Sequence, residues 1–113
     1  MNSADVIGYV KDGTILCPEC SQVHGWIADG ESYPMFADSE SDSPCHCERC
    51  EELIPGLLTS VGMTGVHAAF RNFLRSHGKD GRLEILTEWA RHFHYIPGAR
   101  FFLSRASKYE KVG

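Results

Sequence analysis

Long apolar runs are missing from this sequence. No stretch reaches the roughly 18 consecutive apolar residues of a membrane-spanning helix, so we expect no transmembrane segment. The first residues, Met1 to Asp5, are polar and show neither the basic nor the apolar part of a targeting signal. We therefore expect a soluble, cytoplasmic protein, a compartment in which cysteines are more often metal ligands than disulfide partners.

A full set of disulfide partners is also missing, because the chain has five cysteines and an odd number leaves one unpaired. A length of 113 residues predicts one domain, or one metal module with a helical appendage. Such a chain buries only a modest core, and a metal ion would help it to fold.

Basic residues are scarce in the first half. Residues 1–62 hold two of them, Lys11 and Arg49, against eleven acidic residues, which gives a net charge of −9. Residues 63–113 hold nine basic and four acidic residues, a net charge of +5, so that the whole chain carries −4. The simplest interpretation is that the halves attract each other, within one chain or between subunits. The alternative is that the basic half meets an anionic partner.

Motifs of several enzyme and ion-binding classes are absent. A zinc deaminase needs His-x-Glu followed by Pro-Cys-x-x-Cys, and residues 44–47 (Pro-Cys-His-Cys) break that spacing. A calcium loop needs glycine directly after Asp42, where this chain has Ser43. No two histidines have the four-residue spacing that places imidazoles on one helix face. We therefore predict that the protein is not an enzyme.

Two Cys-x-x-Cys pairs are the strongest positive signal, Cys17 with Cys20 and Cys47 with Cys50. A two-residue spacer in a tight turn holds two sulfurs roughly 3.8 Å apart, the edge of a tetrahedron with Zn–S bonds of about 2.3 Å. Four thiolates leave no open position for water or substrate, which is typical of structural zinc. We predict one structural Zn²⁺; iron can occupy the same cage, although zinc is the commoner occupant.

Other groups lie near these pairs. Cys45 and His46 crowd the second pair, and His24 follows the first, but none has the two-residue spacer to a partner. The 26 residues between the pairs exceed the usual spacing of about 15–20, although a longer loop costs little extra entropy. We interpret Cys45 as a spare thiol or a group beside the ligands.

A thiol–disulfide redox centre is a weaker interpretation of Cys17-Pro18-Glu19-Cys20. It would need a strand followed by a helix, with the first cysteine at the helix N-terminus. The following residues 21–25, Ser-Gln-Val-His-Gly, are not typical of a helix.

The pattern of apolar residues predicts an α+β fold, a small antiparallel zinc ribbon followed by two amphipathic helices. Residues 6–10 and 14–16 should form a hairpin around an Asp-Gly turn, with a short strand near residues 34–37. Helical spacing from Met63 to His77 predicts one helix, with Thr64 as its N-cap and Gly78 as its stop, and a second helix from Asp80 to about His94. The division is then a ribbon module at 1–56, a helical segment at 57–103 and a flexible tail at 104–113.

Several stretches resemble a loose group of short prokaryotic and phage proteins, most of them uncharacterised, which carry a zinc-ribbon head and a helical C-terminal tail. These stretches are residues 9–13, 17–20, 34–42, the second cysteine pair, and residues 81–82 and 87–89. The resemblance implies the four ligands Cys17, Cys20, Cys47 and Cys50, and it implies no reaction and no partner. Cys45 and the chain after Pro97 depart from the group's pattern.

The predicted function is a non-enzymatic binding module, with a protein partner or self-association first. Excess aromatic residues in the C-terminal region favour such an interface. The alternative partner is nucleic acid, whose phosphates could meet the basic residues Arg71, Arg75, Lys79 and Arg82. These residues could equally form an ordinary solvated helix face. No small-molecule substrate is indicated.

Overall fold

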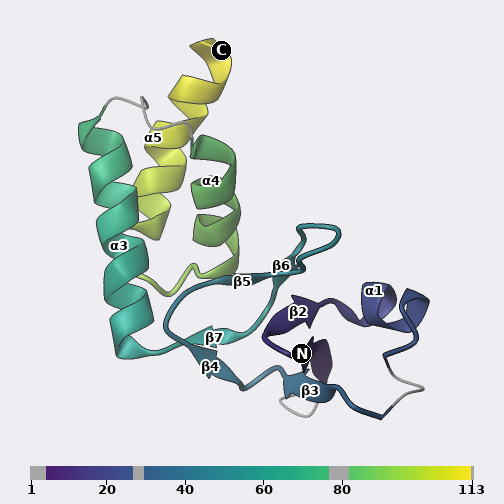
Figure 1. Ribbon diagram of the computed structural model, residues 1–113. Coiled ribbons are helices and arrows are strands. Elements are labelled where there is room, and N and C mark those ends of the chain that lie inside the picture. The colour runs from purple at the N-terminus through teal and green to yellow at the C-terminus, as the bar shows by residue number, and fades with distance from the viewer. Residues whose placement is uncertain (1–4, 27–29, 77–81, 113) are drawn as a thin grey trace. The chain divides into compact units, whose positions relative to one another are not determined.

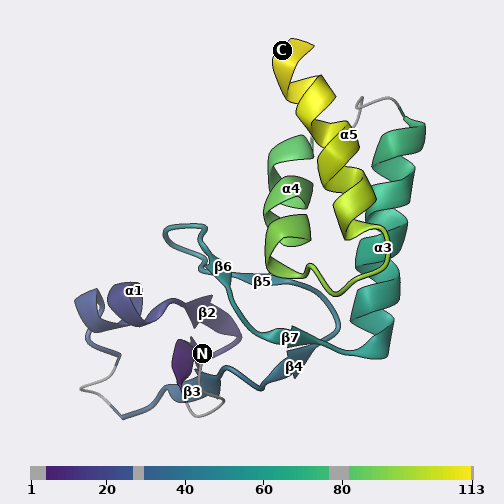
Figure 2. The same ribbon diagram turned by 180° about the vertical axis from the view of Figure 1, so that it is seen from behind.

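The computed structural model describes residues 5–26, 30–76 and 82–112, and it divides the chain into two units, residues 1–59 and 60–113. We name them the cysteine unit and the helical unit and describe each by itself (Figures 1 and 2). The expected division after residue 56 falls before strand β7 (Leu57–Leu58). Strand β7 pairs in parallel with β4 (Glu40–Ser41), so it belongs to the cysteine unit.

The cysteine unit contains a three-stranded antiparallel sheet with the strand order β2-β1-β3. Its strands are β1 (Val6–Lys11), β2 (Thr14–Leu16) and β3 (Tyr33–Phe36). The predicted hairpin is confirmed, since Lys11 pairs with Thr14 across the turn. Asp12 and Gly13 have φ angles of 51° and 81°, the two positive values that a type I′ turn requires. The predicted strand near residues 34–37 is β3.

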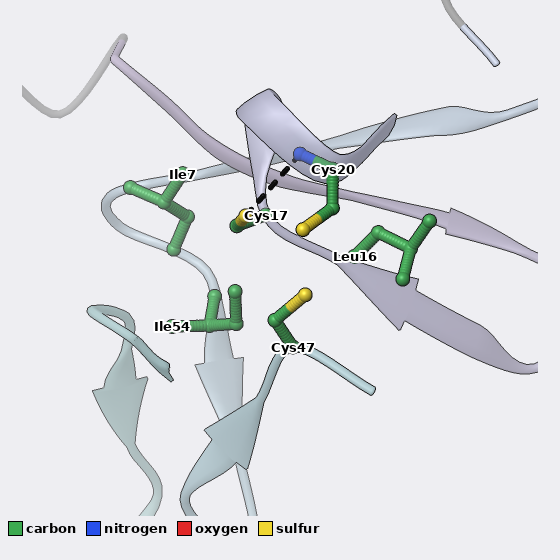
Figure 3. Packing of buried hydrophobic residues seen from close by; sticks show 6 residues of the cluster. All are labelled: Ile7, Leu16, Cys17, Cys20, Cys47 and Ile54. Carbon is green, nitrogen blue, oxygen red and sulfur yellow. Dashed lines mark hydrogen bonds between the residues drawn. The ribbon is translucent and has the colours of Figure 1, made fainter. Parts of the chain in front are cut away.

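A short helix and a second antiparallel strand pair carry the cysteines of this unit. Helix α1 (Pro18–Val23) follows β2, and β5 (Cys45–His46) pairs antiparallel with β6 (Leu53–Ile54). One buried cluster of this unit consists of three aliphatic residues and three cysteines: Ile7, Leu16, Cys17, Cys20, Cys47 and Ile54. Figure 3 shows the cysteine sulfurs lying among the aliphatic side chains. The core of this unit is therefore also the place where its thiols gather.

The helical unit contains α3 (Ser60–Arg75), α4 (Leu83–His92) and α5 (Ala99–Val112). The three helices contact one another in every pairing and lie side by side in both views (Figures 1 and 2). Four phenylalanines fill the core, each 2% exposed or less: Phe70, Phe73, Phe93 and Phe102. The rings of Phe70 and Phe102 stack with centroids 4.9 Å apart, so α3 and α5 are joined through aromatic contact.

The helix ends differ from the prediction. Helix α3 begins at Ser60, and Thr64 lies inside it with its hydroxyl donating to the Ser60 carbonyl at 3.0 Å. The expected stop at Gly78 and start at Asp80 lie outside the described residues. Helix α4 begins at Leu83, and Arg82 before it makes no side-chain cap bond.

A third helix, α5, replaces the expected flexible tail up to Val112. Its buried residues Ala99, Phe102 and Ala106 recur every three or four positions, and the Tyr109 ring meets Phe73 edge-on at 5.6 Å. The apolar stripe therefore continues past residue 103. The described residues form four helices with small strands, so the mixed α and β content is as predicted, while the limit of two helices after the ribbon is not.

Candidate metal centre

The first cysteine turn joins strand β2 to helix α1. Cys17 is the N-cap of the helix, and its Sγ accepts a hydrogen bond from the Cys20 N–H at 3.4 Å. Pro18 occupies the first turn of the helix, where a missing N–H costs nothing. The Ser21 N–H donates to the Cys17 carbonyl at 2.9 Å and closes the turn. The two sulfurs of this pair are thus fixed by backbone geometry.

The second cysteine turn joins strands β5 and β6 and repeats the same contact. The Cys50 N–H donates to the Cys47 Sγ at 3.5 Å. Backbone bonds of 2.8 Å run from the Glu51 N–H to the Cys47 carbonyl and from the Cys47 N–H to the Glu52 carbonyl. Glu51 has a φ of 67°, in the left-handed region, and this conformation turns the chain back toward β6.

Glu48 ties the second turn to the strand that precedes the first. Its backbone N–H donates to the Ile15 carbonyl at 2.9 Å, and its Oε2 accepts from the Ile15 N–H at 2.6 Å. Because Ile15 is two residues before Cys17 and Glu48 directly follows Cys47, these bonds bring the two cysteine pairs together. No local sequence pattern indicates this role of Glu48, since its partner Ile15 is 33 positions away.

The ligand atoms of the four predicted cysteines all lie within 4.8 Å of one another. The Sγ atoms of Cys17 and Cys50, one from each turn, are 3.8 Å apart. This separation equals the edge of a tetrahedron around a metal with bonds of about 2.3 Å to sulfur. Figure 3 shows three of the sulfurs facing a common point. The structure therefore brings Cys17, Cys20, Cys47 and Cys50 together, and the four could hold a metal ion.

The thiols cannot all ionise easily without a cation. The hydrogen bond with Cys17 raises the pKa of Cys20 to about 12. Burial acts to raise the pKa of Cys47, but backbone hydrogen bonds, that of Cys50 first, outweigh it and lower the pKa to about 6. The cluster thus holds one thiol that ionises readily and one that resists ionisation. A bound cation would resolve this conflict, because coordination deprotonates thiols.

The four cysteines differ in exposure. Cys17, Cys20 and Cys47 are 7%, 8% and 1% exposed, whereas Cys50 is exposed. Three ligand candidates are therefore shielded inside the unit's core, and one lies at its surface.

The neighbouring cysteine and histidines stay outside the cluster. The thiol of Cys45 is partly exposed and lies 3.5 Å from the Ser41 Oγ and 3.7 Å from the Ser43 carbonyl. His46 is partly buried, and His24 is exposed at the end of α1. Their positions agree with the interpretation of Cys45 as a spare thiol.

The prediction that no helix follows Cys17, which had spoken against a redox centre, was wrong. The residues after Cys20 continue helix α1, so Cys17 does lie at a helix N-terminus behind a strand. The short helix forms because Cys17 caps it and Pro18 suits its first turn, signals that outweigh the weak propensities of the residues that follow. The sulfurs of the second cysteine pair nevertheless lie close to those of this turn, so the four thiols form one cluster.

The basic residues predicted as anion contacts lie in or beside the helical unit. Arg71 and Arg75 are exposed one turn apart on α3, and Arg82 is exposed just before α4. Lys79 lies outside the described residues. Arg71 and Arg75 thus share one helix face, and contact of the four residues with phosphates stays a prediction.

Comparisons with protein-family models, with curated proteins and with solved structures find no match to this chain. Within the described residues, no helix is long and apolar enough to cross a membrane. The geometry of the four cysteines and the contacts between their two turns are therefore the basis for assigning a function.

Proposed function

We propose that this chain is a structural-zinc module that acts by binding another protein and not by catalysis. The observation that carries the proposal is the set of four thiols, which all lie within 4.8 Å of one another, with the Sγ atoms of Cys17 and Cys50 3.8 Å apart across the two turns. Four sulfur donors in a tetrahedral arrangement suit Zn²⁺. The resemblance to short zinc-ribbon proteins supports the same four ligands.

Zinc held by Cys17, Cys20, Cys47 and Cys50 would join the two turns at the centre of the cysteine unit. Metal–thiolate bonds would stabilise this unit where a larger protein has apolar contacts, because three of the six residues in its buried cluster would be ligands. The ion would have no free coordination position. Its contribution is then to folding, which leaves function to the surface that it supports.

The surface of the cysteine unit supports a protein partner. Strand β3 lies at an edge of the sheet, and it exposes 75% of Tyr33 and 40% of Phe36. A groove of about 570 Å³ beside Cys17 is lined by apolar residues and by Asp5 and Glu52. The unit's net charge of −9 opposes contact with phosphates but not with an apolar or basic protein surface.

Native mass spectrometry before and after chelation tests the metal assignment. We expect one zinc per chain, lost together with the fold of the cysteine unit. The absorption spectrum distinguishes the alternative occupant, because a ferric four-thiolate site is coloured and a zinc site is not. A metal-free protein with an intact cysteine unit would contradict the proposal and favour the redox alternative.

Affinity capture with zinc-loaded protein tests the partner class. We expect a protein that binds the wild type and Val61→Ser but not Tyr33→Ser. Both substitutions remove an exposed apolar side chain, and Val61 lies in the other unit. Because salt screens interactions between charges and not apolar contacts, capture should persist as salt is raised. Capture that ignores Tyr33→Ser, or that disappears with moderate salt, would contradict this surface.

A further inference from the structure

Helix α5 carries an exposed surface that takes no part in the cysteine cluster. Phe102 is fully buried, yet its neighbour Phe101 is 60% exposed. Arg105 and Lys108 are also exposed, and they follow Phe101 at four and seven positions. That spacing places all three on one face of the helix, away from the buried Ala99, Phe102 and Ala106. We name Phe101, Arg105 and Lys108 the α5 stripe.

Contact within the stripe combines a cation with an aromatic ring. The guanidinium carbon of Arg105 lies 5.8 Å from the centroid of the Phe101 ring, which is a cation–π distance. Arg100 is exposed beside the ring in sequence and adds a further positive charge. Because most of the Phe101 ring stays in water, it contributes little to the stability of the helical unit.

Charge divides sharply between the units. The helical unit carries +5, against −9 for the cysteine unit. Within helix α5 the sequence supplies four basic residues and one acidic residue. The stripe therefore belongs to the part of the chain that attracts anions.

We propose that the α5 stripe binds single-stranded nucleic acid. The Phe101 ring stacks on a base, while Arg105, Lys108 and Arg100 contact phosphates. An acidic protein would satisfy the cations equally well, but it would leave the exposed ring without a partner. Unpaired bases offer both a flat apolar face and the neighbouring negative charge. This surface lies outside the cysteine unit, so the proposal does not rest on the protein partner proposed above.

Fluorescence anisotropy with the zinc-loaded full chain tests the proposal. The probe is a labelled single-stranded oligonucleotide of mixed sequence, with a duplex of equal length and polyglutamate as competitors. We expect Phe101→Ala to weaken binding about tenfold, from the loss of one stacked base. We expect Arg105→Gln to weaken it as well and to reduce the slope of log affinity against log salt by about 0.7.

Two matched variants serve as controls. Val61→Ala on α3 removes another exposed apolar side chain, and Arg91→Gln on α4 removes another exposed arginine. Each should leave binding close to that of the wild type, and circular dichroism should show all four variants equally folded. Absence of binding would overturn the proposal. So would unchanged affinity in Phe101→Ala or equal competition by polyglutamate, which would assign the stripe to an acidic protein.

Discussion

The two units of this chain are similar in length but reach an ordered core in different ways. In the cysteine unit, three of the six clustered core residues are cysteines. In the helical unit, four phenylalanines fill the centre, and the Phe102 ring contacts those of both Phe70 and Phe73. The first core contains thiols that could hold a metal ion, while the second consists mainly of buried apolar and aromatic side chains. If the proposed zinc is bound, half of this small chain should depend on an ion that the other half does not need.

Removing the proposed metal should give the largest difference in stability between the two units. Chelation, or the substitution Cys47→Ser, withdraws a binding free energy on the order of 10 kcal/mol from the cysteine unit. We expect that unit to unfold while α3, α4 and α5 persist. Two-dimensional NMR of the amides, together with metal analysis, reports each unit separately. Simultaneous loss of both sets of signals would show that the helical core also depends on the metal.

Phe102→Ala should have the opposite selectivity. Phe102 of α5 is fully buried and stacks on Phe70 of α3, so its truncation should cost the helical unit about 3–5 kcal/mol. Denaturant unfolding followed by far-UV circular dichroism measures the loss. The zinc content should stay at one per chain. A variant that released its zinc under native conditions would argue against independent cores.

Glu48→Ala should loosen the metal site without abolishing it. The change removes the carboxylate that accepts the Ile15 N–H, so the two cysteine turns are held less firmly. We expect about tenfold weaker zinc binding, as for other groups that orient ligands, and a loss of about 1 kcal/mol in stability. Competition with a chromophoric chelator measures the affinity. Glu52→Ala, a neighbouring exposed carboxylate, is the control and should bind zinc like the wild type.

Cys45→Ser should have the smallest effect. Its thiol makes only long contacts to Ser41 and Ser43, which a serine hydroxyl can replace. Stability should change by less than about 0.5 kcal/mol, and one zinc should be retained. Thermal unfolding and metal analysis, run beside Cys47→Ser, decide the matter. Zinc lost from Cys45→Ser but kept in Cys47→Ser would reverse the choice of ligand.

The sequence predicted the hairpin turn correctly but missed two helices. The hairpin at Asp12-Gly13 was predictable because the turn requires positive φ at adjacent residues. Helix α1 was missed, since its cap is a cysteine and not one of the usual polar residues. Helix α5 was missed because the arginines and lysines around Phe102 and Ala106 hid a regular apolar stripe.

The sequence alone was enough to predict the two cysteine pairs, since Cys-x-x-Cys spacing holds two sulfurs close together through backbone geometry within one turn. It also determined the opposite charges of the two halves, which composition alone sets. Only the tertiary structure decided that the two turns meet, because Glu48 and Ile15 pair across 33 positions. It alone decided that Phe102 is buried and Phe101 exposed, since adjacent aromatic residues on a helix are told apart only by what packs against them.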